Sequence, residues 1–209
     1  MSQFFSVHKV NPQPRLIREA VNIVEAGGVI AYPTDSSYAL GCAIGNKEAM
    51  RRIRKIREVG DRHDFTLVCK DLSELSLYAK IDNGIYRLLK RFTPGPYTFI
   101  LTATREVPRR LQNPKRKTIG LRVPDDPVVS MLLGFLEEPL MSSTLILPGE
   151  MLPMNDPLDI RERLEHLLDL VIDAGPCDAE PTSVIDLVDG VPRVLRRGKG
   201  DTGAFEPAA

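Results

Sequence analysis

The chain has few cysteines, and their pattern argues against two classes of protein. Only three occur in 209 residues, Cys42, Cys69 and Cys177, and they are widely spaced and form no C-x-x-C pair. This usage fits a reducing compartment and argues against a disulfide framework and structural zinc. Long apolar runs are also missing: none approaches the roughly 18 residues of a membrane span, and the N-terminus lacks a long apolar core. We therefore expect a soluble, cytoplasmic protein without membrane contact.

A net charge is missing as well, because 28 Lys and Arg residues balance 28 Asp and Glu residues. Without a global positive field, any binding of nucleic acid has to come from local basic patches. The three histidines, His8, His63 and His166, lie far apart and show no metal-ligand spacing. The chain contains no P-loop, no G-x-G-x-x-G and no evident pair of nucleophile and base. We therefore predict no catalytic side chain and no metal site, which disfavours ordinary hydrolases and dinucleotide-binding enzymes.

Helix-like and strand-like patterns alternate along the chain, whose 43% hydrophobic residues suffice for one sizeable core. Periodicity and caps predict helices at 14–26, 47–56, 72–79, 82–91, 128–136 and 156–168. Apolar runs predict strands at 29–32, 65–69, 97–102, 118–123, 140–144, 170–172, 183–187 and 194–196. Segments 97–102 and 118–123 are expected to be antiparallel neighbours. The alternation predicts a single α/β domain over residues 1–209 with a mixed sheet, and a frayed tail over 203–209.

The most informative segment is a hydroxyl-rich turn at residues 34–38, directly after the expected strand 29–32. All five of its side chains carry oxygen, none is positively charged, and Gly41 follows closely. Open α/β sheets bind their ligands at this end of a strand, so the turn is a candidate ligand wall. The alternative is a turn whose Ser and Asp side chains bond only their own backbone.

Three further polar segments end expected strands: Arg122–Asp126, Ser142–Thr144 and Thr182–Ser183. If the sheet brings them to one side, they form a concave site with an arginine among hydroxyls, suited to a carboxylate or phosphate. Each segment also has a structural interpretation. Asp126 can cap a helix, Arg122 can be a charge on the sheet surface, and the hydroxyls of 142–144 can be ordinary strand residues.

Two basic segments complete the candidates. Lys55 and Arg57 are two apart on a helix and can meet on one anion only if the helix ends near them; otherwise both belong to its solvated face. A second basic run connects strands 97–102 and 118–123 and could follow a phosphate backbone, although it lacks interleaved aromatic residues. Protection of a strand edge against aggregation is the alternative. Its candidate RNA-binding residues are Arg109, Arg110, Lys115, Arg116 and Lys117.

Seven segments, taken in order, resemble the motifs of the YrdC/YciO family. They are Pro33–Gly41, Lys55–Arg57, Pro94–Thr98, Gly120–Pro124, Ser142–Thr144, Pro181–Asp186 and Leu195–Gly198. The set is specific and spans nearly the whole chain. Within the family, the run His63–Leu75 and the short start Met1–Phe5 resemble the YciO branch.

The resemblance implies a twisted α/β sheet, flanked by helices, with a large basic cavity. It also implies a relation to threonylcarbamoyl-AMP synthases, which join L-threonine, bicarbonate and ATP, release pyrophosphate and serve tRNA modification. By position, Thr34, Arg122, Ser142 and Ser183 would hold L-threonine or another small acid. The nucleotide would be held by Lys55, Arg57, Thr118, Thr144 and Arg196. ATP would be a substrate accompanied by Mg²⁺, without a tightly bound cofactor.

The chain departs from the synthases of the family at three positions. Ile146 stands where their S-x-N motif has its asparagine, Asp126 stands where they have a histidine, and Glu58 replaces a proline. The loss of a ligand-bonding amide affects chemistry more directly than folding. Three functions follow as alternatives: a weak or altered threonylcarbamoyl-AMP synthase, a protein that binds double-stranded RNA or tRNA, and a sister enzyme acting on another small acid or nucleotide.

Overall fold

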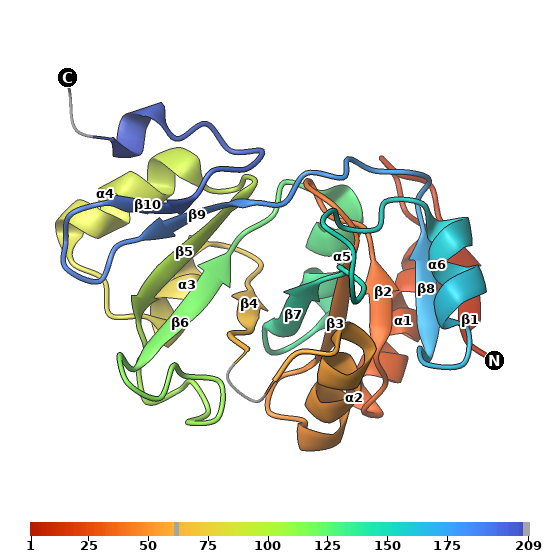
Figure 1. Cartoon of the computed structure of the whole chain (residues 1–209). Coiled ribbons are helices and arrows are strands. Elements are labelled where there is room, and N and C mark those ends of the chain that lie inside the picture. The colour runs from red at the N-terminus through yellow and green to blue at the C-terminus, as the bar shows by residue number, and fades with distance from the viewer. Residues whose placement is uncertain (61–62, 207–209) are drawn as a thin grey trace.

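The computed structural model describes residues 1–60 and 63–206, and a single twisted, mixed sheet runs through the described chain (Figure 1). Its strands are β1 (Gln3–Ser6), β2 (Ile30–Tyr32), β3 (Ala39–Ala43), β4 (Thr66–Val68), β5 (Tyr97–Thr102), β6 (Thr118–Arg122), β7 (Leu140–Thr144), β8 (Leu170–Asp173), β9 (Ser183–Asp186) and β10 (Arg193–Arg196). Their order in space is β1-β8-β2-β3-β7-β4-β6-β5-β9-β10. The predicted antiparallel pairing of β5 with β6 is confirmed.

Helices flank the sheet, as predicted. They are α1 (Pro14–Glu25), α2 (Lys47–Arg57), α3 (Leu72–Tyr78), α4 (Asn83–Phe92), α5 (Pro127–Phe135) and α6 (Pro157–Leu164). The last is shorter than the expected 156–168. Five of them start where a side chain accepts a hydrogen bond from the first turn, namely at Asn46, Asp71, Asp82, Asp126 and Asp156. These caps satisfy backbone N–H groups that a helix start otherwise leaves unpaired.

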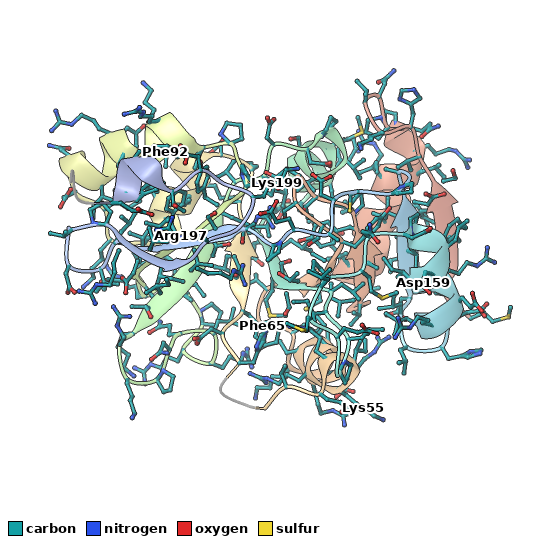
Figure 2. All side chains as sticks on the ribbon, turned by 45° about the horizontal axis from the view of Figure 1, so that its top comes forward. Lys55, Phe65, Phe92, Asp159, Arg197 and Lys199 are labelled. Atoms are coloured by element: carbon teal, nitrogen blue, oxygen red, sulfur yellow. The ribbon has the colours of Figure 1, made fainter. Side chains whose placement is uncertain are left out.

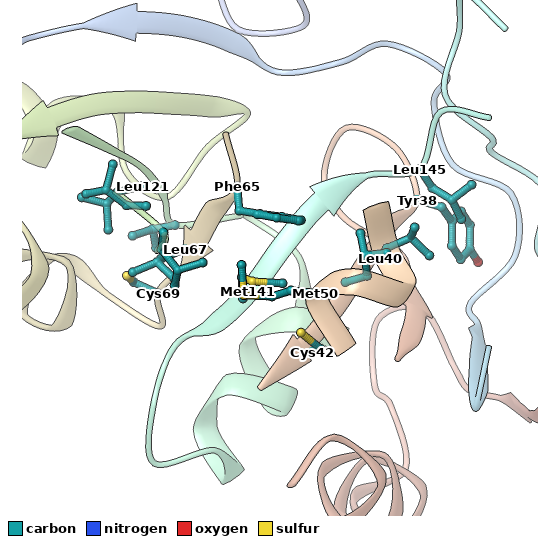
Figure 3. Packing of buried hydrophobic residues seen from close by; sticks show 14 of the residues in the cluster. Tyr38, Leu40, Cys42, Met50, Phe65, Leu67, Cys69, Leu121, Met141 and Leu145 are labelled. Carbon is teal, nitrogen blue, oxygen red and sulfur yellow. The ribbon is translucent and has the colours of Figure 1, made fainter. Parts of the chain in front are cut away.

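Alternating side chains of the strands divide the core into two clusters. In β7, Leu140 packs with α1 and α5, whereas its neighbour Met141 packs with α2 on the opposite face. Figure 3 shows Met141 beside Met50 of α2, with Cys42 and Leu40 of β3 close by. The neighbouring strands β3, β7, β4, β6, β5 and β9 thus pack one face against the apolar cluster that contains Met141. This packing fixes the strands and so positions the polar side chains on their opposite face.

The two ends of the chain depart from the expectations. Residues of β1 were not expected in a strand, yet they pair in parallel with β8. The tail was expected to be frayed from Gly203, and this is wrong for the described part of it. Residues Gly203–Phe205 form a short 3₁₀ helix (η1), and Phe205 is buried against Phe92, Tyr97 and Phe99. The burial of one large aromatic side chain ties this segment down. Residues 207–209 of the expected tail lie outside the described residues.

Candidate functional site

A cavity of about 310 Å³ lies over the strands β3, β7, β4, β6, β5 and β9. Its floor follows the register of the sheet, because Ser142 lies opposite Thr66 and Thr66 lies opposite Gly120. A Cβ atom at Gly120 would meet Thr66 Oγ1 at 3.1 Å and Thr98 at 3.3 Å. A residue without a side chain at this position therefore keeps the floor open.

Three arginines from distant parts of the sequence line this cavity: Arg57 at the end of α2, Arg122 at the end of β6 and Arg196 in β10. Asp64 is the one carboxylate among the described lining residues. Burial lowers the pKa of Arg57, with a further contribution from the charge of Arg196. Partial burial and the charge of Arg122 likewise lower the pKa of Arg196. These arginines destabilise one another's charge, and an anion in the cavity would relieve that cost.

Arg122 is the most deeply buried of the three, at 6% exposure. One of its terminal nitrogens forms an ion pair with Asp35, whose second oxygen accepts the Asp125 N–H at 2.9 Å. Its Nε is buried without a hydrogen-bond partner among the described residues. The interpretation of Arg122 as a sheet-surface charge is therefore wrong. A buried N–H of a cation without an acceptor is costly, which suits this group to a ligand oxygen.

Hydroxyl groups of neighbouring strands surround the arginines. Ser142, Ser143 and Thr144 of β7 all line the cavity, and the Ser142 hydroxyl is 2.6 Å from that of Tyr32. Burial raises the pKa of Tyr32 to about 12, so its hydroxyl stays protonated and can donate. Arg196 donates to the Thr182 carbonyl at 2.8 and 3.0 Å and to its hydroxyl at 3.1 Å. The site thus supplies both fixed donors and adaptable hydroxyls.

The hydroxyl-rich turn contributes differently from the expectation. The Thr34 hydroxyl accepts the N–H groups of Ser36 and Ser37 at 3.2 Å and donates to the Ser37 carbonyl at 2.7 Å. Thr34 thus bonds within its own turn and lines a separate cavity with Asp126 and Lys199. The alternative of a turn whose Asp side chain bonds only its own backbone is wrong, because the Asp35 carboxylate bonds Arg122 and the Asp125 N–H. Ser37 lines the arginine cavity instead. Sequence reasoning could not assign the inward hydroxyl, because the hydrogen bonds within the turn engage Thr34 and are not visible in the sequence.

Two other predicted ligand residues also lie outside the lining. Ser183 is fully buried, and its hydroxyl donates to the Gly200 carbonyl at 2.5 Å and accepts the Gly198 N–H at 3.0 Å. Thr118 lines a smaller adjoining cavity of about 110 Å³, which shares Phe65 and Leu195 with the main one. Ser183 therefore holds the segment after β10 in place, while Thr118 extends the site.

Lys55 and Arg57 do not converge, although α2 ends at Arg57. Lys55 is exposed and absent from the lining, and Figure 2 shows it at the outer edge of α2. For Lys55 the structure supports the alternative of a solvated helix face.

The departures from the synthase motifs have distinct surroundings. Ile146 lines the cavity, and its carbonyl accepts from Arg57 Nε at 3.4 Å. Asp126 caps α5 by accepting the N–H groups of Val128 and Val129, so the interpretation as a helix cap is confirmed. Burial raises the pKa of Asp126. Ile146 is therefore the departure that changes the cavity itself.

The basic connection between β5 and β6 forms an exposed surface outside the cavity. All five predicted RNA-binding residues are exposed, and Arg116 alone of the five makes an ion pair with a described residue, at 2.7 Å to the buried Asp186. Within the described residues, no three His, Cys, Asp or Glu side chains gather as a metal would require, and no helix is long and apolar enough to cross a membrane.

The comparisons with known proteins decide the family. The model of the Sua5, YciO and YrdC proteins, described as "Telomere recombination", matches residues 22–198. The chain belongs to this family. It is 56% identical over 205 residues to the Escherichia coli K12 protein YciO, and this match covers 98% of this chain and 100% of that protein. The crystal structure of E. coli YciO matches it with a TM-score of 0.95, over 99% of this chain and 100% of that one.

Members of the Sua5/YciO/YrdC family with a described activity are more distant. Threonylcarbamoyl-AMP synthase of Nitrosococcus oceani is 31% identical over 157 residues, or 75% of this chain and 84% of that protein. The crystal structure of P. abyssi Sua5 complexed with L-threonine matches with a TM-score of 0.86 and 25% identity. The match covers 94% of this chain and 58% of that one. The expected membership, including the resemblance to YciO, is thus confirmed.

Proposed function

We propose that the arginine cavity binds ATP together with L-threonine and forms threonylcarbamoyl-AMP from these substrates and bicarbonate. The convergence of Arg57, Arg122 and Arg196 on one cavity carries the proposal. A triphosphate and a carboxylate together present several negative charges, which balance three clustered guanidinium groups better than a single small anion does. The L-threonine held by P. abyssi Sua5 and the synthase activity of more distant relatives support the choice of substrates.

The buried Arg122 suits the carboxylate of the amino acid. Its Nε needs an acceptor, and Ser142 lines the same cavity beside the protonated Tyr32 hydroxyl. Arg57 and Arg196 would then hold the phosphates, with the Thr144 hydroxyl as a further donor. Lys55, Thr34 and Ser183 have no direct part in this arrangement, because they do not line the cavity.

The reaction asks for positioning and charge stabilisation rather than a protein nucleophile. The threonine amine attacks bicarbonate and water leaves, which forms a carbamate. An oxygen of that carbamate attacks the α-phosphorus of ATP, the bond to the β-phosphate oxygen breaks, and pyrophosphate leaves. The arginines would stabilise the charge that builds on the phosphates. No cluster of acidic side chains that could hold a metal occurs among the described residues. Mg²⁺ would therefore bind as MgATP, coordinated by phosphate oxygens and water.

The test is a product assay on the full-length protein. ATP, L-threonine and bicarbonate are supplied together or with one omitted, and threonylcarbamoyl-AMP and pyrophosphate are quantified beside a verified synthase. Both products should form only in the complete mixture, and Arg196→Gln should abolish them. Arg193→Gln is the matched control, since Arg193 is an exposed arginine of the same strand outside the cavity lining. Absence of both products in the complete mixture would contradict the proposed reaction.

Binding of double-stranded RNA or tRNA is a second candidate function. It is favoured by the exposed cations of the β5–β6 connection, of which Arg109, Arg110, Lys115 and Lys117 make no ion pair with described residues. The connection reaches the β3–α2 loop, because Arg110 Nη2 would lie 3.5 Å from a Cβ at Gly45. Unpaired surface cations are what phosphate-backbone binding uses.

A further inference from the structure

Three side chains from three segments meet in the wall of the cavity. Arg57 Nη1 at the end of α2 is 2.8 Å from His63 Nε2 and 2.6 Å from Ser143 Oγ of β7. His63 Nε2 is also 3.0 Å from that hydroxyl. His63 stands just before β4, with its ring edge-on to Phe65 at 5.3 Å between centroids. The cluster thus connects the segments on either side of residues 61–62.

The hydrogen bonds determine the protonation of His63. A guanidinium nitrogen can only donate, so His63 Nε2 has to accept from Arg57, which places the ring proton on Nδ1. The charged groups that face the ring are Arg57 and Arg54 of α2, and Asp64 follows it in the chain. Burial, together with the charges of Arg57 and Arg54, lowers the pKa of His63 to about 4. The imidazole is therefore neutral at physiological pH.

A role as general base for Ser143 does not fit this arrangement. His63 Nε2 has one lone pair, and the Arg57 donor already occupies it at the shorter distance. The low pKa also makes the ring a weak base at neutral pH. The serine and histidine are consequently better explained by what they do to Arg57.

Arg57 is held on two of its three nitrogens. Its Nε donates to the Ile146 carbonyl and its Nη1 donates to Ser143 and His63. The hydrogen bonds that Arg57 makes with described residues come from Nε and Nη1, and none comes from Nη2. We propose that His63 is a positioning residue: its neutral ring accepts from Arg57 Nη1 and orients the guanidinium so that Nη2 is presented to a phosphate of the nucleotide. The inference rests on the proposed function for the identity of that anion.

The first experiment measures ATP binding by titration calorimetry with MgATP. His63→Phe keeps a ring against Phe65 but removes the acceptor, whereas His63→Gln restores an acceptor oxygen. We expect His63→Phe to weaken ATP binding roughly tenfold, and His63→Gln to stay within about threefold of the wild type. Equal affinities of the wild type and His63→Phe would overturn the positioning role while leaving the proposed function intact.

The second experiment requires no nucleotide. Nitrogen NMR of the histidine-labelled full-length protein should show His63 protonated on Nδ1 and uncharged from pH 8 to about pH 5, unlike an ordinary histidine. Substitution Arg57→Ala should return its titration toward the ordinary range. A proton on Nε2, or a titration unchanged by Arg57→Ala, would overturn the inference. Should the wild type fail to bind ATP, the proposed function falls, and this measurement still decides whether His63 holds Arg57.

Discussion

Arg122 and Asp35 form an ion pair whose side chains are 7% and 8% exposed. Asp35 belongs to the hydroxyl-rich turn after β2, whereas Arg122 ends β6. The backbone of the same turn is held from a third side, because Lys199 Nζ donates to the Asp35 carbonyl at 2.5 Å. The turn therefore acts on the cavity through Asp35, by fixing an arginine, rather than through the Thr34 hydroxyl.

Removal of the Asp35 carboxylate should leave a buried cation without its partner. We expect Asp35→Ala to lower the free energy of unfolding by about 3 to 5 kcal/mol, measured by urea denaturation. Asp35→Asn should cost less, because the amide oxygen still accepts the Asp125 N–H. The control is Glu48→Ala, which removes an exposed ion pair to Arg51 and should cause no measurable change. A wild-type midpoint for Asp35→Ala would contradict the structural role of the pair.

The low pKa of His63 should make stability depend on pH. Its folded value of about 4 lies below the ordinary 6.5, so the unfolded chain binds the proton more readily. The stabilising contribution is complete above pH 6.5 and is lost as the pH falls toward 4. The urea midpoint should fall more between pH 7 and pH 5 in the wild type than in His63→Gln. The exposed His166→Gln serves as control and should behave like the wild type; an identical fall in all three proteins would speak against this view.

Ile146 places an alkyl group where an amide could bind the substrates. We predict that Ile146→Asn increases the rate of threonylcarbamoyl-AMP formation, because it adds a donor and an acceptor to the cavity wall. Ile146→Val, which keeps the wall apolar, is the matched control and should not increase the rate. An unchanged or lower rate for Ile146→Asn would favour the alternative of a sister enzyme with a different acid or nucleotide.

Neutralisation of the β5–β6 connection should reduce binding of double-stranded RNA. A variant with Gln at 109, 110 and 115 and Asn at 117 removes four exposed cations. Asn suits position 117, because Lys117 has a φ of 55° and Asn tolerates left-handed backbone. The slope of log affinity against log salt should become shallower by up to about 4, measured by fluorescence anisotropy.

Arg116 is kept in this variant because it pairs with the buried Asp186. The control replaces Arg87 and Lys90 of α4, which are also exposed, and should retain the wild-type slope. A change of slope in the control about half as large as in the four-site variant, in proportion to its two removed cations, would indicate that RNA responds to total charge rather than to this connection.

The segment after β10 should tolerate no side chain at Gly198. A Cβ there would lie 2.2 Å from the Pro181 carbonyl oxygen and 2.7 Å from the Thr182 carbonyl carbon. Gly198→Ala should therefore displace the backbone next to Thr182, to which Arg196 donates, and weaken ATP binding as well as stability. Gly134→Ala in α5 is the control, since its Cβ meets nothing within 4 Å and a helix favours alanine. Calorimetric ATP affinities equal to the wild type in both variants would contradict this account.

Local patterns were sufficient to predict most elements of the sheet and its flanking helices. The cap at Asp126 and the antiparallel pair β5–β6 depend on residues close in sequence, so their signals survive without tertiary information. Strand β1 carries only four residues, and its strand conformation depends on pairing with β8, more than 160 positions away. Likewise, Phe205 is ordered by a distant aromatic cluster that no local pattern reveals.

By itself, the sequence determined the kind and order of most elements, the family, and the presence of an arginine and hydroxyls at strand ends. Only the tertiary structure decided which of these residues share a cavity. Arg57, His63 and Ser143 meet because the sheet places β7 beside β4, against their order in the chain. Thr34 stays outside the cavity because it bonds within its own turn, and Ser183 stays outside because it bonds the segment after β10. Lys55 stays outside because its side chain is exposed to solvent. Which partner satisfies a polar side chain depends on the groups that lie near it in three dimensions, and the spacing of motifs in the sequence does not reveal those groups.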